Sequence, residues 1–233
     1  MRPRAVLLDA LGTLVRLDAP WPRLVRELAA RGIGVSLADA EAALRSEMAY
    51  YRTHHDVARD RAGLAALRAD CAAVLRDALP ERVREALAPE QWADVLLAAL
   101  RFEAYPEVPD TLRALREEGA RLVVVSNWDV SLHDVLHDTG LRPLVDAVVT
   151  SAELGAAKPH PAIFARALEL AGGVAPADAL HAGDSVEADV EGALAAGIAA
   201  VLVDRAGELR APAGARVVRS LDGLLPAAPY PPG

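Results

Sequence analysis

The hydrophobic residues near the start of the chain form an unbroken run rather than an alternating pattern. Ala5–Leu8 is entirely aliphatic, and Asp9 follows it directly. A run of this kind is typical of a strand buried on both faces of a parallel sheet, and Gly12 then permits a sharp turn. Asp9 is therefore predicted at the carboxyl end of a central strand, where open α/β sheets bind their ligands. A carboxylate there can be a nucleophile, a metal ligand or both, although it can also simply cap the next segment.

From residue 16 to residue 104 the hydrophobic positions follow the helical period instead. The first stripe begins near Trp21 with i, i+3 and i+4 spacing and stops at Gly32. Ser36 followed by Asp39 is typical of a capping box that opens a second helix. Further stripes occur at residues 64–78 and 92–100. No strand pattern interrupts this stretch, which therefore predicts an all-helical insert of three to five helices.

Beyond residue 105 aliphatic runs alternate with helical stretches. The predicted strands cover residues 121–126, 146–150, 179–182 and 199–203, with a further candidate at 216–218. Strands that alternate with helices predict a parallel sheet with right-handed crossovers, so the expected fold class is α/β. The expected domains are an α/β core at residues 1–15 and 105–225, the helical insert at 16–104 and an irregular, proline-rich tail at 226–233.

Composition and charge exclude several classes of protein. The 233 residues are 53% hydrophobic and carry a net charge of −8, which supports a real core and argues against binding to the nucleic acid backbone. Cys71 is the single cysteine, so neither an intramolecular disulfide nor a cysteine-based metal cluster can form. No apolar run has the length of a membrane span, and Asp9 interrupts the one run that resembles a signal peptide. We expect a cytoplasmic protein, monomer or homodimer, with a small-molecule substrate and no nucleic acid or membrane partner.

Polar residues stand at the ends of the predicted strands or in the loops just after them. They are Asp9, Ser126, Lys158, Asp184 and Asp189. Together they form a chemically consistent set: a carboxylate nucleophile, a hydroxyl and an ammonium for anionic oxygens, and two acids for a divalent cation. Ligation by oxygen alone favours a hard ion, and Mg²⁺ with a phosphate is the usual case.

This set resembles the haloacid dehalogenase (HAD) superfamily, and within it the subfamily with a helical cap. The resemblance rests on four motifs in order: Asp9-Ala10-Leu11-Gly12-Thr13-Leu14, Ser126-Asn127, the segment 151–161 with Lys158-Pro159, and Gly183-Asp184 with Asp189. It implies a Rossmann-like core with strand order 5-4-1-2-3 and a helical cap at residues 16–104.

The resemblance also implies a role for each motif residue. Asp9 would be the covalent nucleophile and a metal ligand, and the backbone carbonyl of Leu11 would be a second ligand. Asp184 would bind Mg²⁺ directly, and Asp189 directly or through water. The group that is transferred would be bound by Ser126, Asn127 and Lys158. Lys158 would also partly neutralise the negative charge of the carboxylates.

One position departs from the pattern. Phosphatases of this superfamily carry a second aspartate two residues after the nucleophile, and Leu11 stands there instead. General acid–base catalysis is typically worth about 10²–10⁴-fold, so a slow Mg²⁺-dependent phosphatase with an aspartyl-phosphate intermediate is expected. Two alternatives stay open: a 2-haloacid dehalogenase, whose halide leaves without a proton, and a catalytically silent member that binds a phosphorylated ligand or a protein.

Overall fold

The computed structural model describes residues 2–210 and 212–225 of the chain. The tail predicted at residues 226–233 lies outside the described residues. The chain divides into two units. Among the described residues, the core unit comprises residues 2–16, 104–127 and 132–225 without 211, and the helical unit comprises Leu17–Glu103 and Trp128–Ser131.

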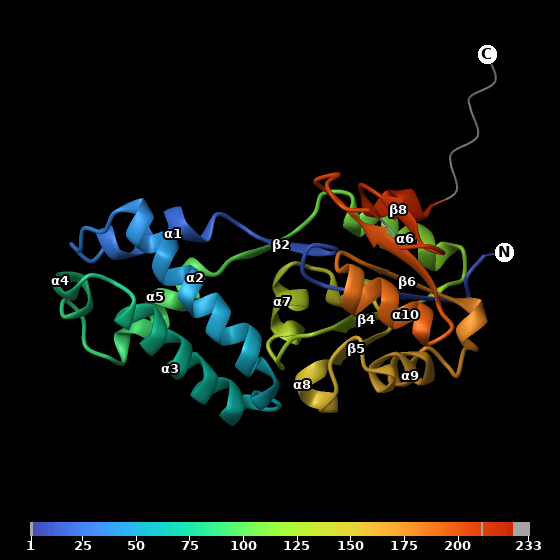
Figure 1. The fold of residues 1–233 in the computed structure, drawn as a ribbon, viewed down its shortest axis with the longest axis horizontal. Coiled ribbons are helices and arrows are strands. Elements are labelled where there is room, and N and C mark those ends of the chain that lie inside the picture. The colour runs from blue at the N-terminus through green and yellow to red at the C-terminus, as the bar shows by residue number, and fades with distance from the viewer. Residues whose placement is uncertain (1, 211, 226–233) are drawn as a thin grey trace, which may run out of the picture. The chain divides into compact units, whose positions relative to one another are not determined.

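The core unit is built on a parallel sheet, which has six strands among the described residues (Figure 1). The strands are β1 (Ala5–Leu8), β4 (Arg121–Ser126), β5 (Ala147–Thr150), β6 (Ala179–Gly183), β7 (Ala199–Val203) and β8 (Arg216–Val218). Their order is β5-β4-β1-β6-β7-β8. The α/β class is confirmed. The five strands predicted from aliphatic runs have the order that the resemblance implies, and β8 extends the sheet beside β7.

The register brings the carboxyl ends of the central strands to one edge of the sheet. Leu8 of β1 lies opposite Val124 of β4 and Ala182 of β6. The Asp9 N–H continues this ladder by donating to the Ala182 carbonyl oxygen over 2.9 Å. Asp9 therefore shares this edge with Ser126, the last residue of β4.

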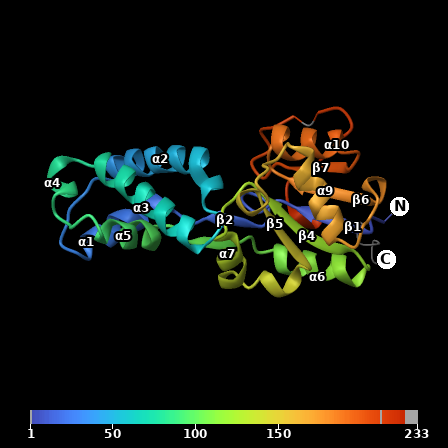
Figure 2. The same cartoon turned by 90° about the horizontal axis from the view of Figure 1, so that it is seen from below.

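Helices cover both faces of this sheet, α9 and α10 on one face and α6 on the other (Figure 2). The α-helices of the core unit are α6 (Val108–Glu117), α7 (Leu132–Asp138), α8 (Ser151–Leu154), α9 (Pro161–Leu170) and α10 (Gly192–Ala195). Short 3₁₀ segments are η2 (Arg142–Leu144), η3 (Pro176–Asp178) and η5 (Leu221–Leu224). Alternate strand residues, such as Leu7 and Val123, pack with Phe164 of α9 and Ala193 of α10 in one buried cluster.

A π-helical turn, η4 (Val186–Glu191), precedes α10. The helical stretch after the strand predicted at residues 179–182 thus begins with a π turn, which the sequence pattern does not reveal. The N–H groups of Asp189 and Val190 both donate to the Ser185 carbonyl oxygen, over 3.1 and 3.2 Å, which widens the helix by one residue. Such turns occur mostly inside helices and often at functional sites. Here it carries the buried carboxylate of Asp189.

The helical unit contains five α-helices within the described range Leu17–Glu103. They are α1 (Pro20–Ala29), α2 (Leu37–His54), α3 (Arg61–Asp77), α4 (Glu81–Arg84) and α5 (Gln91–Ala99), with the 3₁₀ segment η1 (His55–Val57) after α2. Their apolar faces form one buried cluster that includes Leu28, Leu44, Leu75 and Trp92. The predicted N-terminal capping residue of α2 is confirmed, because the Ser36 hydroxyl accepts a hydrogen bond from the Asp39 N–H over 3.1 Å.

Two features at the borders of this insert correct the prediction. Strands β2 (Val15–Leu17) and β3 (Phe102–Ala104) pair in a small sheet, although residues 16–104 were predicted to contain no strand. Three residues are too few for an alternating pattern to be recognised. The segment Trp128–Ser131, directly after Ser126-Asn127, also joins the helical unit. There the Trp128 ring packs against Phe102 with centroids 5.0 Å apart.

No helix among the described residues combines the length and hydrophobicity of a membrane span.

Candidate active site

Asp9 is held just beyond the end of β1, with only 6% of its surface exposed. Its Oδ1 accepts hydrogen bonds from Ser126 Oγ over 3.0 Å and from Lys158 Nζ over 2.6 Å. Burial raises the pKa of Asp9, because the charged carboxylate loses hydration, and the Lys158 ammonium opposes this shift. Since β1 and β4 are neighbours, the sheet order itself brings Asp9 and Ser126 together.

Lys158 is a buried cation that bridges two carboxylates. Its Nζ donates to Asp9 Oδ1 over 2.6 Å and to Asp189 Oδ1 over 2.5 Å, and 2% of its side chain is exposed. Burial alone would lower the pKa of Lys158, but the charges and hydrogen bonds of the two carboxylates outweigh burial and raise that pKa. Lys158 therefore remains an ammonium that links Asp9 to Asp189.

Asn127 fixes the backbone of the residue that carries this ammonium. Its Nδ2 donates to the Lys158 carbonyl oxygen over 2.9 Å, and its Oδ1 accepts from the Lys158 N–H over 2.7 Å. Both polar atoms of the Asn127 amide group are thus hydrogen-bonded to the backbone of Lys158. In this arrangement Asn127 acts on the site through Lys158, and its direct contact with substrate stays a prediction.

Asp189 is the second buried carboxylate of the site, with 1% of its surface exposed. His181 Nε2 lies 2.9 Å from Asp189 Oδ1, and the Ser185 N–H donates to Oδ2 over 3.0 Å. Burial works against the charged form, but Lys158 and His181 together lower the pKa of Asp189.

The sequence did not predict the contact between His181 and Asp189. His181 lies in β6, within the strand predicted at residues 179–182. It is fully buried, and its ring stands edge-on to Phe164 with centroids 5.3 Å apart. Its position in a strand that ends at Gly183 is the signal that pointed towards the site.

Asp184 is an exposed carboxylate that lies against the loop after Asp9. A Cβ atom at Gly12 would lie 2.0 Å from Asp184 Oδ2, so only glycine leaves room for this side chain. The Gly12 φ of 80° also falls in the left-handed region that favours glycine. Loss of hydration, followed by the negative charges of Asp9 and Asp189, raises the pKa of Asp184 to about 7.

Leu11 places an apolar side chain two residues after Asp9. It is 45% exposed, and its backbone forms an isolated bridge with Val15. Its side chain has no group that can give or take a proton. Whether its carbonyl oxygen ligates a metal stays a prediction.

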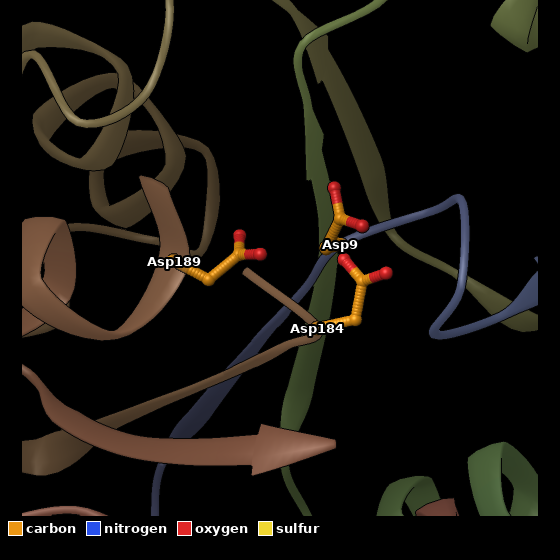
Figure 3. Close-up of side chains that lie close together, drawn as sticks. All are labelled: Asp9, Asp184 and Asp189. Carbon is orange, nitrogen blue, oxygen red and sulfur yellow. The ribbon is translucent and has the colours of Figure 1, made fainter. Parts of the chain in front are cut away.

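Three carboxylates converge at the edge of the sheet (Figure 3). Asp9, Asp184 and Asp189 can each offer one oxygen, and these oxygens all lie within 4.8 Å of one another. One ammonium, Lys158, faces three carboxylates, and such an excess of negative charge favours the binding of a cation or of protons. Carboxylate oxygens are the ligands that Mg²⁺ prefers. The residues present therefore fit a hard divalent cation.

This geometry suits nucleophilic attack by a carboxylate on a centre that bears anionic oxygens, since donors and a potential cation site surround it. The sequence matches the model of a protein family described as haloacid dehalogenase-like hydrolase over residues 3–197. The chain belongs to this family. It is accordingly a member of a hydrolase family, and the motif residues predicted from the HAD resemblance lie together in its site.

Relatives within the family differ in the activities that they are named for. Haloacid dehalogenase-like hydrolase domain-containing protein 3 of Bos taurus is 48% identical over 93 residues, which are 40% of this chain and 37% of that protein. The match thus spans well under two thirds of that relative. The phosphoserine phosphatase of Thermus thermophilus is 33% identical over 223 residues, 87% of this chain and 89% of the relative. A solved structure of a dehalogenase is 26% identical, with a TM-score of 0.64 and 95% of each chain covered.

Proposed function

We propose that this HAD hydrolase is a Mg²⁺-dependent phosphatase that cleaves a small phosphoric monoester through an aspartyl-phosphate intermediate. The observation that carries the proposal is the convergence of Asp184 and Asp189 on a buried Asp9 that Lys158 and Ser126 already contact. The similarity to a phosphoserine phosphatase over most of both chains supports the same class of reaction.

The first step is attack of an Asp9 oxygen on phosphorus. The Ser126 and Lys158 hydrogen bonds both engage Oδ1, so we assign the attack to Oδ2. A bond forms between Oδ2 and phosphorus while the bond from phosphorus to the ester oxygen breaks. Leu11 has no proton to give, and the leaving oxygen therefore takes its proton from water. This makes the step slow for alkoxide leaving groups.

The second step is attack of water on the phosphorus of the intermediate. The bond between Asp9 and phosphorus breaks, inorganic phosphate leaves with both protons of the attacking water, and the Asp9 carboxylate is restored. In both steps Lys158 keeps its hydrogen bond to Asp9 Oδ1 and donates its third N–H to a phosphoryl oxygen, while the single Ser126 hydroxyl proton turns from Asp9 Oδ1 to another phosphoryl oxygen. Asp9, Asp184 and Asp189 would hold Mg²⁺ together with the predicted Leu11 carbonyl. When bound, the ion supplies positive charge that offsets the charge of the phosphoryl oxygens.

A second candidate is a 2-haloacid dehalogenase, and Leu11 is the observation that favours it. Halide leaves without a proton, so such an enzyme needs no acid at this position. The carboxylates of Asp184 and Asp189 oppose this candidate, because they would repel a carboxylate substrate from Asp9. We therefore favour the phosphatase.

The test is phosphate release from a panel of phosphomonoesters and an acyl phosphate, with and without Mg²⁺, in the parent and in Asp9→Asn. We expect Mg²⁺-dependent turnover in the parent and none in Asp9→Asn, because the nearly isosteric amide has no anionic oxygen to attack phosphorus. The matched control is Asp110→Asn, on α6, whose aspartate side chain is 90% exposed.

Circular dichroism and thermal melting check that the variants are folded. Activity of Asp9→Asn near the parent level would contradict the covalent mechanism. A parallel assay of halide release from 2-haloacids would identify the dehalogenase. A folded parent that turns over neither class of substrate would favour a silent, ligand-binding member.

A further inference from the structure

Arg205 reaches from the end of β7 to the loop that follows Asp9. Its Nε donates to the Gly12 carbonyl oxygen over 2.9 Å, and its Nη2 donates to the Thr13 carbonyl oxygen over 2.7 Å. These carbonyls belong to consecutive residues, so one guanidinium holds the loop at two adjacent points. The planar fork of arginine is suited to such a paired contact, whereas a lysine ammonium is a single point charge.

The surroundings of Arg205 in turn fix the guanidinium. Its Nη1 lies 2.8 Å from Glu107 Oε1, and 20% of each of these side chains is exposed. Its central carbon lies 3.3 Å from the centroid of the Tyr105 ring, a cation–π contact. Glu107 is held as well, since its Oε1 accepts from the Leu221 N–H over 3.4 Å. Arg205 is thus a fixed support rather than a mobile surface side chain.

The loop that Arg205 holds carries one member of the acidic cluster and touches another. Asp9 precedes Gly12 by three residues, and the Cα of Gly12 packs against the Asp184 carboxylate so closely that a Cβ would lie 2.0 Å from Oδ2. A shift of the Gly12 carbonyl would therefore change the spacing between Asp9 and Asp184.

We propose that Arg205 is a positioning residue, which sets the spacing of Asp9 and Asp184 by fixing the Gly12 and Thr13 carbonyl groups. The predicted effect of Arg205 on Mg²⁺ affinity rests on the proposed function, whereas its predicted effect on the rigidity of the loop does not. Supports around metal ligands typically change metal affinity by about 10–100-fold when they are removed.

The experiment compares the full-length parent with Arg205→Lys and Arg205→Gln. The matched control is Arg113→Lys, on the exposed side of α6, where Arg113 pairs with Asp110. Glu107→Gln is a milder variant that leaves Arg205 in place but removes its ionic partner. Hydrogen exchange of peptides that cover residues 9–16 reports on the loop. The Mg²⁺ concentration that is needed for a thermal shift of fixed size reports on the acidic cluster.

We expect both Arg205 variants to exchange faster at residues 9–16 and to need about 10–100-fold more Mg²⁺, while strand β4 and the Arg113→Lys control match the parent. Glu107→Gln should change both readouts in the same direction by less. Unchanged exchange in Arg205→Lys and Arg205→Gln overturns the inference. So does faster exchange with an unchanged Mg²⁺ requirement for the same thermal shift, because the loop could then move without disturbing the site.

A parent without any Mg²⁺ response is a separate outcome, since it overturns the metal part of the proposed function. Hydrogen exchange of residues 9–16 is then the only test of the Arg205 proposal. Faster exchange in the variants supports the role of Arg205 in fixing the loop, and unchanged exchange overturns that role. If the Arg205 variants do not fold, Glu107→Gln gives the same two readouts.

Discussion

Leu11 is the single residue that sets the chemistry of this site apart from a fully equipped phosphatase. Asp9 is surrounded, as the HAD motifs predict, by Ser126, Lys158, Asp184 and Asp189. The side chain two residues after Asp9, however, has no ionisable proton to donate. Protonation matters most for an alkoxide leaving group and least for a nitrophenolate or an acyl phosphate. We therefore expect weak turnover that is biased towards good leaving groups.

Replacement of Leu11 by Asp tests this bias directly. Leu11 is 45% exposed, so a carboxylate can stand there without being buried. Leu11→Asp should raise the turnover of alkyl phosphates more than that of nitrophenyl phosphate, by up to about 10²–10⁴-fold. The gain is expected to be smaller than this limit, because the surroundings of position 11 do not orient a carboxylate.

The control for this substitution is Leu11→Asn, which has similar size and polarity but no carboxyl proton. A gain in both variants would assign the effect to polarity rather than to acid catalysis. If the folded, Mg²⁺-bound Leu11→Asp variant gains nothing on any phosphate ester while the parent releases halide from 2-haloacids, the phosphatase proposal is wrong.

At the scale of elements, the turn after β1 is the part of the site with the strictest geometry. Gly12 combines a positive φ with a missing side chain where the Asp184 carboxylate lies. Gly12→Ala should therefore cost about 1–2 kcal/mol of stability from the left-handed backbone, and in addition displace Asp184. We expect the variant to lose most of the thermal shift that Mg²⁺ gives the parent.

Gly119 offers a matched control for this prediction. Its φ is 88°, but no atom lies within 4 Å of the position that a Cβ would take. Gly119→Ala should lose a similar amount of stability and keep the full Mg²⁺ response. Equal Mg²⁺ responses in the two variants would contradict the importance of the contact between Gly12 and Asp184.

The elements also show how far the sequence alone leads. The strands of the sheet were predictable, because runs such as Ala5–Leu8 are buried on both faces and contain only aliphatic residues. The contact between Asp9 and Ser126 was predictable from the expected strand order, because their strands are neighbours in the sheet. The contacts of Arg205 and His181 were not predictable, because each depends on a tertiary approach between residues 8 to 193 positions apart. The π-helical turn of η4 was missed because Asp189 shares a carbonyl acceptor with its neighbour, a detail that no periodicity reveals.

At the scale of the whole molecule, the proposed metal site and the tryptophan residues lie in different units. Asp9, Asp184 and Asp189 belong to the core unit. The three tryptophans of the sequence, Trp21, Trp92 and Trp128, all belong to the helical unit. Each unit has a buried hydrophobic cluster of its own. Calorimetry therefore monitors the unfolding of both units, whereas tryptophan emission monitors that of the helical unit.

We expect Mg²⁺ to raise the melting temperature measured by calorimetry more than that measured by tryptophan emission. A ligand that binds only the native state stabilises the part that binds it, by about 2.7 kcal/mol at a concentration of one hundred times Kd. For a chain of this size that free energy corresponds to a shift of about 5–10 °C. Ca²⁺, which is larger and demands a different coordination number, should give a different shift and serves as a comparison ion. No calorimetric shift at saturating Mg²⁺ would contradict the metal site. Equal shifts by both methods would show instead that the two units unfold as one cooperative body, because stabilisation of the core unit would then reach the tryptophans of the helical unit in full.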